Sequence, residues 1–151
     1  MIQRIQSVYL ALAFVILAVC LCLPVGVFSP QSAMGTDITM FNLWELKDNN
    51  MTFSEFPMFI LLLLTCVMTL YTIFSYKNRP KQIKLCSLCM LLVVAWIVVY
   101  LLFVFVFAEK DLVFTPTFAA CLPIVALILY YLARRGVIHD EKLVKAADRI
   151  R

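Results

Sequence analysis

Four long uncharged segments, separated by short polar ones, dominate the chain. They cover about residues 5–28, 56–76, 85–108 and 112–134. A helix rises about 1.5 Å per residue, so about 20 residues cross a hydrocarbon core about 30 Å thick. Each segment reaches that length and is apolar all round, whereas a buried core helix is shorter and keeps a polar stripe. The pattern predicts an all-α integral membrane protein built as a four-transmembrane-helix bundle.

The few charged residues predict how this bundle is oriented. If the N-terminus lies inside, the inner segments hold eleven basic residues against three acids, and the outer segments hold two against six. Lys and Arg accumulate on the cytoplasmic flanks of membrane helices. We therefore expect both termini to lie in the cytoplasm.

Composition narrows the class of protein further. Hydrophobic residues make up 64% of the 151 residues and charged ones 15%, against about 45–50% and about 25% in soluble domains. A soluble enzyme, a disordered tail and a nucleic-acid binder with spread basic charge are therefore excluded. Ionisable groups inside membrane spans usually mark ion or proton pathways, and the four segments carry no charged residue before Arg134, at the end of the last one. With the lone His139 beyond the fourth segment, we predict no metal or cofactor.

The connection of about residues 28–55 is the one sizeable outer loop. A turn pattern at residues 47–50 separates residues 38–46 from 51–53, both rich in β-branched and aromatic side chains. This arrangement predicts either a short β-hairpin or an irregular cap, resting on the helix ends. Residues 109–111 are expected to form a minimal outer turn. The candidate outer-loop contacts are Phe41, Leu43 and Trp44.

The last segment, residues 137–151, is predicted to be a cytoplasmic tail distinct from the transmembrane domain at residues 1–136. It resembles a short amphipathic helix that begins at Asp140 and carries an apolar stripe. So short a helix is marginal alone, so the stripe would be covered by the membrane surface, the basic turn at residues 77–84 or a protein groove. The alternative is a solvated basic end. The candidate partner-docking residues are Asp140, Glu141, Leu143, Val144, Ala147, Arg149 and Ile150.

Cysteines suggest a redox site. Cys86 and Cys89 have the C-x-x-C spacing of thiol oxidoreductases. They lie at the expected cytoplasmic, reducing end, and the outer loop has no cysteine partner for them. Buried thiols also behave as small hydrophobic groups. The structural role is therefore favoured over a redox or metal role.

Proline and aromatic residues in the spans raise the possibility of a lipid or quinone cavity. Pro123 lies inside the fourth segment, where proline would kink the helix. Such a kink either shapes a cavity for a lipid or a quinone, or has no function. Trp96 and Tyr100 are expected to face lipid or to pack inside.

Motifs along the whole chain point to a known family. They are residues 1–10 (MIQRIQSVYL), the outer Phe41-Asn42-Leu43-Trp44, the basic turn after the second segment, and the closing residues 140–144 and 148–151. The chain resembles the family of domain of unknown function 4293, uncharacterised four-helix membrane proteins of Bacteroidetes. The resemblance implies an inner-membrane protein of a Gram-negative bacterium. It implies no activity and no catalytic or binding residue.

Two functional hypotheses follow. The first is a non-enzymatic small subunit or scaffold that docks protein partners through its cytoplasmic tail and outer loop. The second is a lipid- or quinone-handling protein, redox-active through Cys86 and Cys89. A pocket lined by Pro123, Cys121, Cys66 or Tyr100 would favour the second. The lipid bilayer is a partner in both hypotheses, and nucleic acid in neither.

Overall fold

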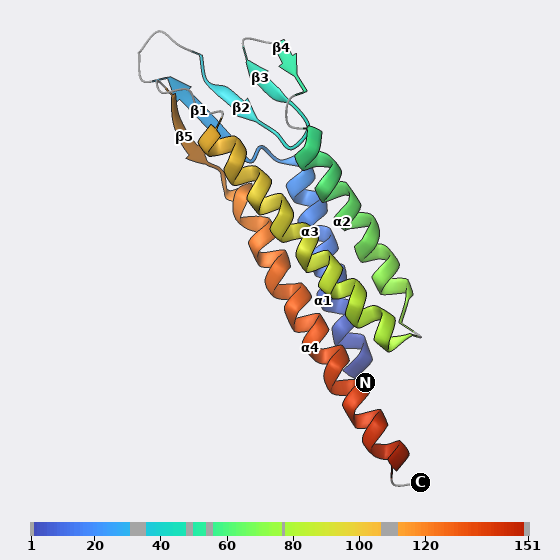
Figure 1. Ribbon diagram of the computed structural model, residues 1–151. Helices are drawn as coiled ribbons and strands as arrows, with labels where there is room; N and C mark the ends of the chain where they lie inside the picture. Colours follow the sequence, from blue (N-terminus) through green and yellow to red (C-terminus); the bar gives the residue numbers. More distant parts are fainter. Residues whose placement is uncertain are drawn as a thin grey trace.

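The computed structural model describes residues 2–30, 36–47, 50–53, 56–76, 78–106 and 112–149. Within them, four long helices form an antiparallel bundle (Figure 1). Helices α1 and α3 each pack against both α2 and α4, so the bundle closes into a ring. The helices are α1 (Ile2–Cys22), α2 (Phe56–Phe74), α3 (Arg79–Val106) and α4 (Leu122–Arg149).

The two ends of the bundle differ in chemistry. Both termini and the link between α2 and α3 lie at one end, and a small sheet covers the other (Figure 1). We call them the basic end and the sheet end. Cationic side chains of α3 and α4 gather at the basic end: Arg79, Lys81, Lys84, Arg134 and Arg135.

The sheet has five antiparallel strands in the order β4-β3-β2-β1-β5. They are β1 (Gly26–Pro30), β2 (Ile38–Met40), β3 (Glu45–Lys47), β4 (Asn50–Thr52) and β5 (Leu112–Pro116). The pairing of β3 with β4 realises the hairpin, one of the two predicted alternatives. Pairing of β3 with β2, and of β2 with β1, extends this hairpin into a larger sheet.

The predicted start of the fourth helix at residue 112 is wrong. Residues Leu112–Pro116 form β5, which pairs with β1 from Gly26↔Pro116 to Pro30↔Leu112. A 3-10 turn, η1 (Phe118–Cys121), then leads into α4. The strand forms because the β-branched and aromatic residues of this segment pair with the edge of β1, which is distant in the sequence.

Other helix ends also differ from the prediction. Helix α1 ends at Cys22 rather than residue 28, because Pro24 and Gly26 interrupt it. Helix α3 begins at Arg79 rather than residue 85. The helix includes residues 79–84 of the basic turn. Pro80 lies in the first helical turn, where proline is tolerated.

Helix α4 overturns two further expectations. It runs without a break through Gly136 to Arg149, so the tail is a continuation of the fourth span and not a separate helix begun at Asp140. Pro123 lies within the candidate span Phe118–Val144 but in the first turn of α4, not in the helix interior where it would kink the helix. Proline needs no partner for its missing N–H in a first turn, so the structure gives no reason for a mid-span kink.

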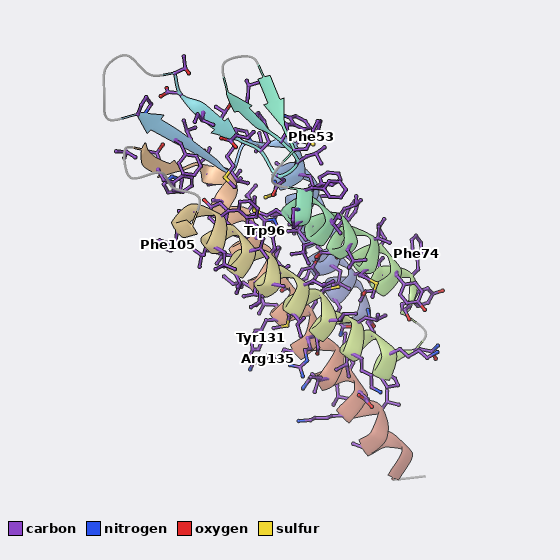
Figure 2. All side chains as sticks on the ribbon, turned by 45° about the horizontal axis from the view of Figure 1, so that its top comes forward. Phe53, Phe74, Trp96, Phe105, Tyr131 and Arg135 are labelled. Carbon is purple, nitrogen blue, oxygen red and sulfur yellow. The ribbon has the colours of Figure 1, made fainter. Side chains whose placement is uncertain are left out.

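The bundle is apolar on its outer surface, and its apolar core encloses a few polar side chains. Its four helices contain segments long and apolar enough to cross a membrane, with only 22–33% of each span buried. Phe74 and Phe105 point away from the bundle and are 75% and 78% exposed (Figure 2). The buried polar side chains of the described residues are Gln6, Asn42, Thr65, Thr69, Thr72 and Gln82. The exposed apolar surface is compatible with a multi-pass protein that meets lipid.

Exposed aromatic residues mark the two boundaries of the apolar surface. On α2, Phe56 and Phe74 stand 18 positions apart, or about 27 Å along the helix axis. This separation matches the thickness of a hydrocarbon core, about 30 Å. Towards the sheet end the exposed aromatic residues are Phe53, Phe56, Phe105 and Phe118, and towards the basic end Tyr71, Phe74, Tyr76 and Tyr131.

Candidate functional site

Asn42 joins the sheet-end loop to the bundle. Its side chain is fully buried and its Nδ2 donates a hydrogen bond of 2.7 Å to the carbonyl oxygen of Cys20 at the end of α1. Its Oδ1 accepts a hydrogen bond of 3.2 Å from Nε1 of Trp96 on α3. One loop residue therefore bonds two helices at once.

A tight turn directs Asn42 inwards. The backbone N–H of Phe41 donates to the carbonyl of Trp44 at 2.9 Å, and their two rings lie 5.3 Å apart. The predicted contacts Phe41, Leu43 and Trp44 are all half-buried, whereas Asn42 between them is completely enclosed. Sequence reasoning missed Asn42, although an amide within an aromatic motif is a cue for a buried polar contact.

An aromatic cluster continues this contact towards the sheet. The Trp96 and Tyr100 rings stack at 5.3 Å, and the Tyr100 hydroxyl donates to the Val25 carbonyl at 3.2 Å. Trp96 and Tyr100 are buried, so the packing alternative is confirmed and the lipid-facing one is wrong. Phe114 of β5 sits against Tyr100, and a Cβ at Gly26 would collide with the Phe114 ring. Glycine at this position leaves room for the Phe114 ring where β1 and β5 pair.

A line of buried threonine hydroxyls follows α2 through the middle of the bundle. Thr65, Thr69 and Thr72 each donate to a carbonyl one turn earlier at 2.7 Å. Thr69 Oγ1 also lies 2.5 Å from the hydroxyl of Tyr130 on α4. The single hydroxyl hydrogen of Thr69 already bonds to Thr65, so the Tyr130 hydroxyl is the donor. This bond connects α2 and α4 across the ring of helices.

Replacing Tyr130 with phenylalanine should destabilise the bundle measurably. Interhelical hydrogen bonds in membrane proteins contribute about 0.6–1.7 kcal/mol, and the exchange removes one such donor while keeping the ring. We expect thermal unfolding of the purified protein in mild detergent to occur a few degrees lower, at about 2–4 °C per kcal/mol. The matched control is Tyr131→Phe, whose side chain is exposed. Equal shifts in the two variants would contradict the assignment.

Cys86 and Cys89 lie in the closed interior of the bundle. Both are fully buried, and all six cysteines are free thiols. No group of three or more His, Cys, Asp or Glu side chains within the described residues is arranged to hold a metal ion. The structure brings the two thiols to the same buried face of α3 without bonding them, and the redox hypothesis stays a prediction.

At the basic end, Asp140 binds within its own chain. Gln6 Nε2 on α1 donates a 2.5 Å hydrogen bond to Asp140 Oδ2, and Arg79 Nη1 on α3 reaches the Asp140 carbonyl at 3.5 Å. Gly136 permits the close approach, because a Cβ there would stand 3.0 Å from Gln6 Cγ. Asp140 is therefore a link between three helices, not the expected N-cap.

The remaining docking candidates divide by position. Glu141 is half-buried and has an interaction partner. Leu143 and Val144 are exposed, at 52% and 43%. The side chains of Ala147 and Arg149, and the whole of Ile150, lie outside the described residues. Of the predicted docking surface, the structure therefore presents Leu143 and Val144.

A surface pocket lies on α4 close to the basic end. Its volume is about 200 Å³, and it is lined by Tyr131, Arg134, Arg135 and Ile138. Figure 2 shows Tyr131 and Arg135 projecting outwards from α4. A pocket lined by Pro123, Cys121, Cys66 or Tyr100 would have favoured the lipid or quinone hypothesis, and none of these residues lines this pocket.

Fold and polar contacts together define a class of protein. It is a four-helix bundle with helices long and apolar enough to cross a membrane, polar contacts inside and a small sheet over one end. The chain belongs to the family described as Domain of unknown function (DUF4293), whose profile matches residues 2–150. No curated protein matches the chain.

Proposed function

We propose that this protein is a non-enzymatic small subunit or scaffold of a bacterial inner membrane. Its four helices cross the bilayer with both termini in the cytoplasm, and the far end of α4 docks a protein partner. The observation that carries the proposal is α4, a single helix of 28 residues that continues beyond the other helices (Figure 1). Leu143 and Val144 are exposed on that extension.

Charge supports the orientation. The basic end carries Arg79, Lys81, Lys84, Arg134 and Arg135, and cationic residues favour the cytoplasmic side of membrane helices. At the sheet end, Asp37 and Glu45 belong to the connection between α1 and α2. The proposed orientation therefore puts the positive end inside.

The tail is a better docking surface than the sheet-end loop. Asn42 of that loop uses its amide for contacts within the chain, and the rings of Phe41 and Trp44 lie against each other. The α4 extension is held at its base by Asp140. A helix fixed at one end presents its exposed face with little loss of conformational entropy on binding.

Site-specific photo-crosslinking in intact cells tests the docking proposal. A benzophenone amino acid at position 143 or 144 should give a discrete crosslinked protein, whereas the same probe at Ile128, exposed on the span, should not. Leu143→Glu should abolish the crosslink from position 144, because it puts charge into an apolar contact. A shortened chain ending at Glu141 keeps the contacts of Asp140 and should lose the partner.

Two results would overturn the docking proposal. One is crosslinking of equal strength from positions 128 and 144. The other is recovery of the same co-purifying proteins with the full chain and with the chain that ends at Glu141. A reporter fused after Arg151 tests orientation separately: activity confined to the cytoplasm is expected, and activity outside contradicts it.

A further inference from the structure

The pocket on α4 has the chemistry of an anion site. Two of its four lining residues are arginines, Arg134 and Arg135, and a third, Tyr131, supplies a hydroxyl. A guanidinium presents several N–H donors in a planar fork that matches phosphate oxygens. A site needs about 10–15 Å³ to hold one water molecule, so a volume of about 200 Å³ has room for a phosphate group.

One nitrogen of the Arg134 guanidinium lacks a hydrogen-bond partner among the described residues. This atom, Nε, is buried. A buried donor without a partner costs free energy, more so when the group is charged. Arg134 lines the pocket, so an anion bound there would lie against this guanidinium.

An apolar track leads from the pocket along the outside of the span. Ile124, Ile128 and Tyr131 are exposed at 50%, 54% and 51%, and Arg135 is also exposed. Positions 124, 128, 131 and 135 follow the helical i, i+4, i+7, i+11 spacing, so they share one face of α4. Arg134 and Arg135 are the first charged residues after the uncharged stretch from Leu112 to Ala133. The pocket therefore lies at the level of the span where the headgroup of a lipid would join its acyl chains.

We propose that this pocket binds the phosphate of an anionic phospholipid. Arg134 and Arg135 hold the phosphate oxygens, the Tyr131 hydroxyl donates beside them, and an acyl chain lies over Ile128 and Ile124. The apolar track favours a lipid over free phosphate, because a free ion leaves it uncovered. The inference rests on the membrane placement in the proposed function and is independent of partner docking.

Native mass spectrometry of the purified, delipidated full chain tests the site. The probes are phosphatidylglycerol, phosphatidylcholine and inorganic phosphate, each titrated separately. We expect phosphatidylglycerol to bind most tightly, and Arg134→Gln or Arg135→Gln to weaken it about tenfold, as for loss of a charge-assisted hydrogen bond. Lys142→Gln is the matched control, since it removes the same charge from an exposed site on α4 outside the pocket.

Each alternative outcome has a distinct meaning. Equal weakening by Lys142→Gln would show diffuse attraction to charge and overturn the site. Inorganic phosphate binding as tightly as phosphatidylglycerol would overturn the lipid assignment. Arg134→Lys keeps the charge but lacks the planar fork. If it binds phosphatidylglycerol more weakly than the unmodified chain and more tightly than Arg134→Gln, the proposal is supported. Unchanged binding by both Arg134 variants refutes it. Unfolding temperatures recorded beside each titration separate lost binding from lost folding.

Discussion

Asn42→Leu is expected to lower the free energy of unfolding by about 3 kcal/mol. The substitution leaves the Cys20 carbonyl and the Trp96 Nε1–H buried without their partner, and each such group costs about 1–3 kcal/mol. For a chain of this size, about 2–4 °C is lost per kcal/mol. Thermal unfolding of the purified protein in mild detergent should therefore occur about 6–12 °C lower.

A double-mutant cycle assigns this loss to the two hydrogen bonds. Trp96→Phe removes the donor to Asn42 and keeps an aromatic ring, so its effect and that of Asn42→Leu should be less than additive. The matched control is Leu43→Ala, at the half-buried neighbouring position, with a smaller expected shift. Full additivity, or an equal shift in the control, would show that Asn42 does not act through these contacts.

Gly136→Leu is expected to lower the free energy of unfolding by about 2–4 kcal/mol at the basic end. Gln6 Cγ stands 3.0 Å from the place of a Cβ at Gly136, so a branched side chain drives α1 and α4 apart. Overpacking costs about 1–3 kcal/mol. Loss of the hydrogen bond from Gln6 to Asp140 adds about 1 kcal/mol.

The control for this prediction is Gly136→Ala. A methyl group requires Gln6 to move only a few tenths of an ångström, and alanine is more favourable than glycine inside a helix by about 1 kcal/mol. The alanine variant should therefore unfold close to the unmodified protein. Combining Gly136→Leu with Gln6→Ala should restore part of the lost stability in the detergent unfolding assay. Equal effects of alanine and leucine, or no restoration, would contradict the role given to this close approach.

The sequence predicted only part of the candidate sites. The stretch around Phe41, Leu43 and Trp44 was expected to rest on the helix ends, but Asn42 makes the bonds. Asp140 was singled out, although for capping and docking rather than for its bond to Gln6, 134 positions away. The pocket of Arg134 and Arg135 was not expected, because it depends on which face of α4 remains open.

The sequence by itself determined the existence and number of the apolar helices. Length and hydropathy suffice for this, because a helix satisfies its own backbone hydrogen bonds and needs only enough apolar side chains to remain in lipid. The uncharged stretches therefore predicted all four candidate spans. The first three stretches contain the greater part of a helix that the structure describes, and the fourth contains the first part of α4.

Only the tertiary structure decided what those helices enclose. Strand β5 needs the edge of β1, and Asn42 needs the ends of α1 and α3. Tyr130 needs a hydroxyl on α2. Each pairing joins residues far apart in the chain, and its partner is chosen by packing geometry rather than by local hydropathy. The apolar character of a span can be read along one segment, whereas the polar contacts buried in the core exist only once the helices meet.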